Sequence, residues 1–122
     1  MAQVVGRGEV KVSLYRHLAP LTVNALMRTL PVESRVNVQR AMVTLFTAVR
    51  VGVEKHRTSF ERGDVAFLAS GGLLCFFLRS VTSDRPLNPV GRVDSGLELL
   101  DALGPGSVIR LSLGQAEQQV AV

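Results

Sequence analysis

The stretch Gly63-Asp64-Val65-Ala66-Phe67-Leu68-Ala69-Ser70-Gly71-Gly72-Leu73-Leu74-Cys75-Phe76-Phe77-Leu78 contains two short apolar runs separated by a pair of glycines. Glycine and aspartate are typical turn residues, so Gly63-Asp64 and Gly71-Gly72 mark the points where the chain changes direction. The second run is apolar without interruption, which is typical of a strand covered on both faces. We therefore expect two buried strands, at 65–68 and 73–78.

Further strands are expected on both sides of this stretch. Residues 9–15 and 108–113 alternate apolar and polar side chains, the period of a half-buried strand. Residues 42–46 and 48–53 are rich in Val, Thr and Phe, which favour strands. A turn-like stretch is expected at 33–40. A loop is expected at 83–89, because this segment holds two prolines.

Two short helices are also predicted. Apolar residues at 23, 26, 27 and 30 form one stripe of an amphipathic helix that begins near Pro20 and stops before Pro31. Ser95 and Glu98 have the spacing of a capping box, so we expect a second helix over 96–103 that ends at Gly104. Strand, helix, several strands, short helix and strand, in that order, indicate a mainly-β, closed or nearly closed barrel of short, mostly antiparallel strands capped by two helices.

Composition bounds the organisation of the chain. With 122 residues, 47% of them hydrophobic and 20% charged, it fits one globular domain, 1–122, with a core over about 9–113. No apolar run is long enough to span a membrane, and residues 1–6 do not read as a signal peptide. A single cysteine, Cys75, suits a reducing compartment. We expect a soluble cytoplasmic protein with no membrane partner.

The charged and metal-ligating residues argue against several classes of function. The chain carries 14 basic side chains and a net charge of +4, but the basic residues are scattered rather than gathered with stacking aromatics, so we expect no nucleic-acid partner. His17 and His56 are far apart, and neither has a partner at metal-ligand spacing. Cys75 lies inside an apolar run, typical of an inert buried thiol, and Asp64 is most simply a turn residue. We expect neither a metal nor a cofactor.

Three segments carry a family resemblance. Residues 19–24, Ala-Pro-Leu-Thr-Val-Asn, resemble the start of the first cyclophilin helix, and residues 75–78, Cys-Phe-Phe-Leu, resemble a cyclophilin strand that ends in Phe-Phe-Ile. Residues 90–101, from Val-Gly-Arg-Val to Glu-Leu-Leu-Asp, look like the segment that enters the second cyclophilin helix. All three occur in cyclophilin order.

A small, mostly uncharacterised family of cyclophilin-like barrels from archaea and bacteria is more similar still. The resemblance covers roughly 9–113 and is carried by residues 30–34, Asn37, Gly63-Asp64-Val65, residues 72–77 and residues 91–100. These are motifs of turns, caps and core, so the resemblance implies the barrel fold and leaves the activity open.

The catalytic segment of the prolyl isomerases is not matched. Those enzymes carry Phe-His-Arg-x-Ile and then Phe-x-x-Gln-Gly-Gly-Asp, where this chain has Glu-Ser-Arg-Val-Asn-Val-Gln-Arg at 33–40 and no tryptophan anywhere. Arg35 can be aligned with the catalytic arginine and is the best catalytic candidate. Whether the chain is an enzyme at all stays open, with a binding role favoured.

One polar group stands between the first helix and the following strand. Glu33, Ser34 and Asn37, together with Arg40 and Phe76, form our candidate ligand-binding set at the mouth of the barrel. The alternative is ordinary turn chemistry at a helix exit, which Asn and Ser also serve.

Three functions are carried forward. The first is a binding module that takes a small molecule or a peptide in the barrel-mouth cleft. The second is a weak peptidyl-prolyl isomerase. The third is a structural or interaction subunit that acts through a sheet edge, for which the apolar Val120-Ala121-Val122 is the candidate and a homodimer one of the forms left open.

We predict that prolyl isomerase activity is absent or very weak. A catalytic arginine acts only when it is held next to the proline amide, and a misplacement of ~1 Å costs about a hundredfold in rate. A protease-coupled assay on a short proline peptide, with wild type and Arg35→Ala, measures this. Robust catalysis that Arg35→Ala abolishes would contradict the binding-module interpretation.

Overall fold

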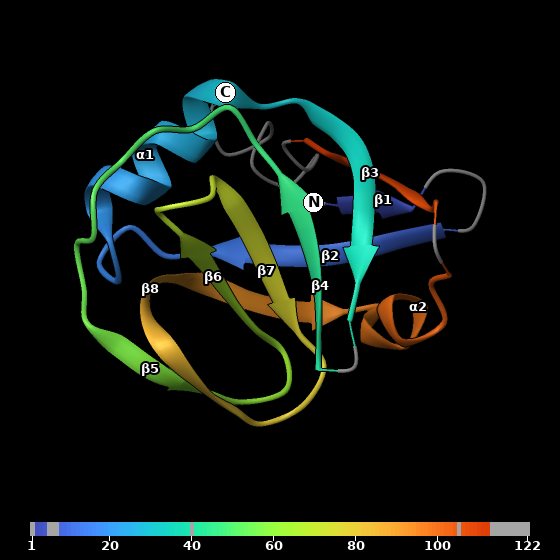
Figure 1. The fold of residues 1–122 in the computed structure, drawn as a ribbon. Helices are drawn as coiled ribbons and strands as arrows, with labels where there is room; N and C mark the ends of the chain where they lie inside the picture. Colours follow the sequence, from blue (N-terminus) through green and yellow to red (C-terminus); the bar gives the residue numbers. More distant parts are fainter. Residues whose placement is uncertain (1, 5–7, 40, 105, 113–122) are drawn as a thin grey trace.

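The computed structural model describes residues 2–4, 8–39, 41–104 and 106–112, which form nine strands and two short helices (Figure 1). The strands are β1 (Ala2–Val4), β2 (Gly8–Leu14), β3 (Val32–Val38), β4 (Met42–Phe46), β5 (Arg57–Phe60), β6 (Asp64–Leu68), β7 (Leu73–Phe77), β8 (Val81–Ser95) and β9 (Val108–Leu111), and the helices are α1 (Pro20–Thr29) and α2 (Leu97–Asp101). Among the described residues, neither helix has the length that crossing a bilayer requires.

All pairings between the strands are antiparallel, in the order β2-β1-β9-β3-β4-β7-β6-β8-β5, and β2 also pairs with β8. Two strands change partner halfway along. Residues 8–10 of β2 pair with β1 and residues 11–14 with β8, while residues 32–35 of β3 pair with β9 and residues 36–38 with β4. These two strands therefore belong to both parts of the sheet.

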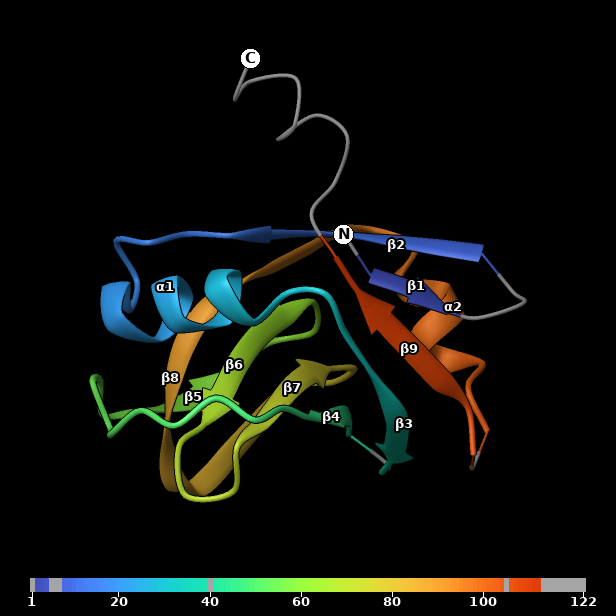
Figure 2. The same ribbon diagram turned by 90° about the horizontal axis from the view of Figure 1, so that it is seen from above.

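The expected closed barrel is found only in part. The chain is mainly β, with short antiparallel strands and two short helices. Strands β4, β7, β6 and β8 curve as a half-barrel, a smaller part made by β1 and β9 is joined to it through β2 and β3, and β5 is an extra strand on β8 (Figure 2). An alternating pattern reports which side chains are buried but not where a strand changes partner, so the sequence predicted a simpler barrel.

The hairpin of β6 and β7 is buried on both faces, as the sequence predicted. Its inward side chains join the main core, and its outward side chains form a second cluster with Phe60 of β5 and Leu87 of β8. The inward set is Val65, Phe67, Leu74 and Phe76, and the outward set is Ala66, Cys75 and Phe77. Phe77 stacks on Phe60 with ring centroids 4.7 Å apart.

Several segment predictions were wrong. Residues 33–40, expected as a turn, fall largely in β3, and residues 83–89, expected as a loop, lie inside β8. The two prolines of β8 lie where the pairing with β5 and β6 shifts register, so a missing backbone donor is tolerated there. Residues 48–53, expected as a strand, alternate in burial only as far as residue 52 and pair with no strand among the described residues. Two short strands, β1 and β5, were not predicted.

The start of α2 also differs from the expectation. Ser95 is the last residue of β8, and the helix begins after Gly96, which has a φ of 88° and no side-chain cap. A Cβ at Gly96 would lie 2.6 Å from the backbone oxygen of Glu9, so close packing on β2 requires glycine here. The expected edge segment at 120–122 lies outside the described residues.

A buried amide fixes the irregular segment before β5. The Asn88 side chain is 1% exposed, and its Oδ1 accepts hydrogen bonds from the backbone N–H groups of Glu54 (2.7 Å) and Lys55 (3.0 Å). Its Nδ2 donates to Thr22 Oγ1 (2.9 Å) and to the Gly52 carbonyl (3.0 Å). Every donor and acceptor position of the Asn88 amide is therefore used, and these hydrogen bonds connect β8, α1 and this segment.

Glu54 in turn caps α1. The residue before the helix supplies no side-chain cap, and the Glu54 carboxylate accepts from the backbone N–H groups of Leu21 (3.0 Å) and Thr22 (2.8 Å) and from the Thr22 hydroxyl (2.8 Å). Partial burial raises the pKa of Glu54, but these hydrogen bonds together lower it by a larger amount. The pKa of Glu54 is therefore below its ordinary value. The ionised carboxylate therefore stabilises the fold.

We predict that Asn88→Ala lowers the free energy of unfolding by about 2–4 kcal/mol, because it leaves buried donors and acceptors without partners. Urea unfolding followed by circular dichroism measures the change. The matched control is Asn37→Ala at an exposed position of β3, for which we expect a change within about 0.5 kcal/mol. Equal losses in the two variants would contradict the role of the buried amide.

We predict that Glu54→Gln lowers stability at pH 7 by roughly 0.5–1 kcal/mol, because a carboxylate favours a helix N-terminus. The folded pKa of Glu54 is lowered, so its contribution is complete above the ordinary value of 4.5 and is lost as pH falls through the folded pKa. The variant should therefore lose less stability than wild type below pH 4.5. Glu33→Gln, at an exposed position, is the control in the same pH series, and parallel curves for Glu54→Gln and wild type would refute the prediction.

Candidate functional site

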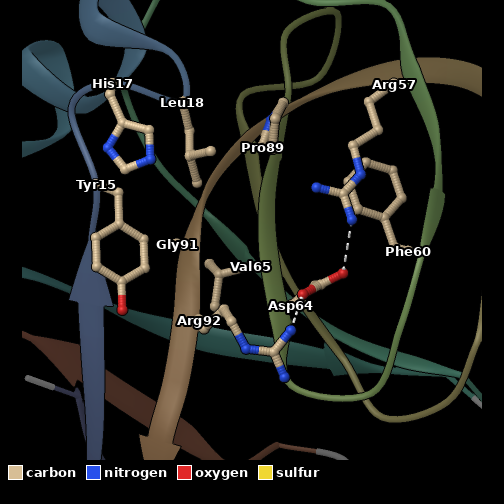
Figure 3. A pocket seen from close by; sticks show the side chains of 10 residues that line it. All are labelled: Tyr15, His17, Leu18, Arg57, Phe60, Asp64, Val65, Pro89, Gly91 and Arg92. Atoms are coloured by element: carbon tan, nitrogen blue, oxygen red, sulfur yellow. Dashed lines mark hydrogen bonds and ion pairs between the residues drawn. The ribbon is translucent and has the colours of Figure 1, made fainter.

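A pocket of about 310 Å³ lies between β5, β6 and β8 on one side and the segment that links β2 to α1 on the other (Figure 3). Its lining combines charged, aromatic and aliphatic side chains: Tyr15, His17, Leu18, Arg57, Phe60, Asp64, Val65, Pro89, Gly91 and Arg92. Seven of the ten lining residues belong to β5, β6 and β8, and the other three belong to the segment that follows β2. We call it the arginine pocket, after Arg57 and Arg92.

A buried carboxylate organises this pocket. Asp64 is 6% exposed, and its Oδ2 accepts from Arg57 Nη2 (3.1 Å) and from the Glu61 backbone N–H (2.8 Å). Its Oδ1 accepts from Arg92 Nη1, and the two residues are directly opposite each other in the pairing of β6 with β8. Since a buried carboxylate needs partners for its charge, Asp64 fixes where both guanidinium groups lie.

The two guanidinium groups are held by further contacts. Arg57 Nε donates to the Ser59 carbonyl (2.9 Å), and the Arg57 guanidinium lies 4.8 Å from the centroid of the Phe60 ring. Arg92 Nη2 donates to the Arg62 carbonyl (3.3 Å). The arginine side chains are nevertheless 44% and 49% exposed, so both present charge to the pocket.

The opposite wall is aromatic. Tyr15 follows β2 and is held there by its backbone N–H, which donates to the Val90 carbonyl (2.8 Å). The rings of Tyr15 and His17 lie with centroids 5.8 Å apart and face the arginines across the pocket (Figure 3). The pocket therefore has a charged floor and apolar, partly aromatic walls.

Two other clefts hold fewer charged and aromatic side chains than the arginine pocket. One, of about 620 Å³, is lined by residues 46–52 and 69–72, among which Arg50 is the only charged side chain. The other, of about 530 Å³, adjoins the arginine pocket through Arg57 and Phe60. That cleft also holds Glu61, but the arginine pocket is the one of the three that combines a buried carboxylate, two guanidinium groups and three rings.

Comparison with known proteins identifies the family. A family model described as "Cyclophilin-like" matches residues 1–112. The chain belongs to the cyclophilin-like family. Its fold resembles the solution structure of the hypothetical protein AF2241 from Archaeoglobus fulgidus, with a TM-score of 0.78 and 24% sequence identity over 93% of this chain and 92% of that one. No curated protein sequence matches the chain.

The site predicted for this cyclophilin-like chain does not coincide with the arginine pocket. Glu33, Arg35 and Asn37 lie at alternate, exposed positions of β3, and Ser34 lies on the other face of that strand. Phe76 is fully buried in the main core. Arg40 lies outside the described residues. The structure therefore brings three of the predicted residues onto one face of β3, and a ligand site there stays a prediction.

The sequence predicted the turn contact of Asp64 but not its two ion pairs. The turn role is confirmed, because Asp64 accepts from the Glu61 N–H three residues before it. The two arginines were missed because they lie seven positions before and 28 positions after Asp64. The available signal in the sequence was a charged residue directly before an apolar strand. Such a residue needs a polar or charged partner, but its position does not identify that partner.

The remaining reactive groups are placed outside the pocket. Cys75 is 2% exposed, so the expected buried thiol is confirmed, and burial raises the pKa of this thiol to about 12, which disfavours the reactive thiolate. Among residues 2–4, 8–39, 41–104 and 106–112, no three His, Cys, Asp or Glu side chains come together as metal ligands.

Proposed function

We propose that this cyclophilin-like protein is a binding module that takes a small, negatively charged organic molecule in the arginine pocket. The observation that supports it is the Arg57–Asp64–Arg92 group, in which one buried carboxylate holds two partly exposed guanidinium groups at the floor of a cleft. Ligand pockets of this kind combine apolar walls with a few placed polar groups.

The arginines keep hydrogen-bonding capacity for a ligand. A guanidinium group carries five N–H donors. Arg57 uses Nη2 and Nε in the contacts described above, and Arg92 uses Nη1 and Nη2. The donors that remain are held in place by Asp64, so a ligand meets a site that is already ordered before it binds.

Binding is favoured over catalysis in this pocket. Among the described residues that line the pocket, Asp64 is the one with a carboxylate, and both of its oxygens already accept hydrogen bonds from fixed donors. Within the described part of the chain, the His17 ring contacts Tyr15, and no hydrogen bond orients it. General acid–base catalysis depends on such orientation.

We predict that acetate and inorganic phosphate bind the arginine pocket. In ¹H–¹⁵N correlation spectra of the full chain, millimolar concentrations of either anion should cause saturable shifts at residues 15–18, 57–65 and 89–92. Arg92→Gln should weaken binding at least about tenfold, because one charged donor pair is lost.

The matched control is Arg85→Gln, which removes one exposed positive charge from the same strand, β8, and should change the affinity by less than about twofold. If neither acetate nor phosphate causes saturable shifts, the proposed function is refuted. Shifts confined to residues 33–37 would instead move the site to the exposed face of β3.

A further inference from the structure

We infer that the ligand of the arginine pocket is an aromatic monocarboxylate, with its carboxylate on Arg57 and Arg92 and its ring against the opposite wall. This inference rests on the proposed function and adds to it the chemical class of the ligand. Three features of the pocket carry it: its net charge, the shape of its donors, and the character and size of its walls.

The charge of the site fits one negative charge. Arg57 and Arg92 contribute two positive charges and Asp64 one negative charge, which leaves one positive charge at the floor. The nearby Arg62 and Asp101 are paired with each other and add no net charge. A single carboxylate neutralises the floor, whereas a phosphate dianion would leave excess negative charge close to the Asp64 carboxylate.

The donors fit a planar group. Guanidinium groups bind carboxylates through two parallel N–H donors, and both guanidinium groups are fixed in orientation by Asp64. Arg57 cannot turn freely, since its Nε is also held by the Ser59 carbonyl and its plane lies near the Phe60 ring. A planar carboxylate therefore meets these donors at little cost in ordering.

The walls fit a flat apolar body. Tyr15 and His17 present rings on one side, and the buried side chains of Pro89 and Val65 lie behind the space between those rings and the arginines (Figure 3). Aromatic rings pack well against other rings at offset or edge-to-face angles. With about 310 Å³, the pocket is at the lower end of ligand cavities, so it suits a molecule of one or two rings.

Isothermal titration calorimetry and NMR titration with benzoate, acetate, benzamide, cyclohexanecarboxylate and inorganic phosphate test this inference. We expect benzoate to bind at least about tenfold more tightly than acetate, because the ring buries apolar surface. Benzamide, which has the ring without the charge, should bind at least about tenfold more weakly than benzoate, and cyclohexanecarboxylate should fall below benzoate because its ring is not flat.

Two variants separate the ring from the charge. Tyr15→Ala should weaken benzoate about tenfold and leave acetate within about twofold, whereas Phe46→Ala, at an aromatic residue that is 59% exposed outside the pocket, should change neither. Asp64→Asn raises the charge of the floor by one and should favour phosphate over benzoate relative to wild type. If that variant does not fold, the Tyr15→Ala comparison still decides the question.

Failure of the inferred ligand class and failure of the proposed binding function give different results. If acetate and phosphate bind but benzoate is no tighter than acetate, or phosphate is tighter than benzoate in wild type, the ligand class is wrong and the proposed binding function remains. If Tyr15→Ala weakens acetate as much as benzoate, the aromatic wall is not a ring subsite and the inference fails. If no anion binds, the proposed function itself fails.

Discussion

The hairpin of β6 and β7 is buried on both faces, and this constraint sets the position of the elements around it. Its inward side chains need the main core, and its outward side chains need a second cover, which β5 and the first half of β8 provide. Because β8 must reach from that cover to β2, it runs for 15 residues and bends where its pairing shifts register. The arginine pocket opens at the point where these strands meet.

The pocket follows from how the fold accommodates one buried charge. Asp64 begins β6 at the edge of the doubly covered hairpin, so its carboxylate is removed from water and requires partners. β5 and β8 each supply an arginine, and these residues also border the outside of the protein. The contacts that satisfy Asp64 thereby order two cationic groups in a cleft, which links the stability of this region to its capacity for binding an anion.

Local patterns predicted the parts of the fold that depend on neighbouring residues. α1 begins at Pro20 and ends at Thr29 as its stripe and flanking prolines indicated, and the uninterrupted run at 73–77 is a strand covered twice. The errors fall where tertiary contacts override local preference. The prolines of β8 are accommodated at register shifts. The segment that follows β4 is held by Asn88, which bonds the backbone of Gly52, Glu54 and Lys55, rather than by a neighbouring strand.

The sequence by itself determined the mainly-β class, the first helix, the central hairpin, the buried thiol of Cys75 and membership of the cyclophilin-like family, because each depends on periodicity, turn residues or motif order within short segments. Only the tertiary structure decided the partner changes of β2 and β3 and the meeting of Arg57, Asp64 and Arg92. A charge pair across strands depends on register and on which face each side chain occupies. Register is fixed by packing across the whole sheet, and no local stretch of sequence contains it.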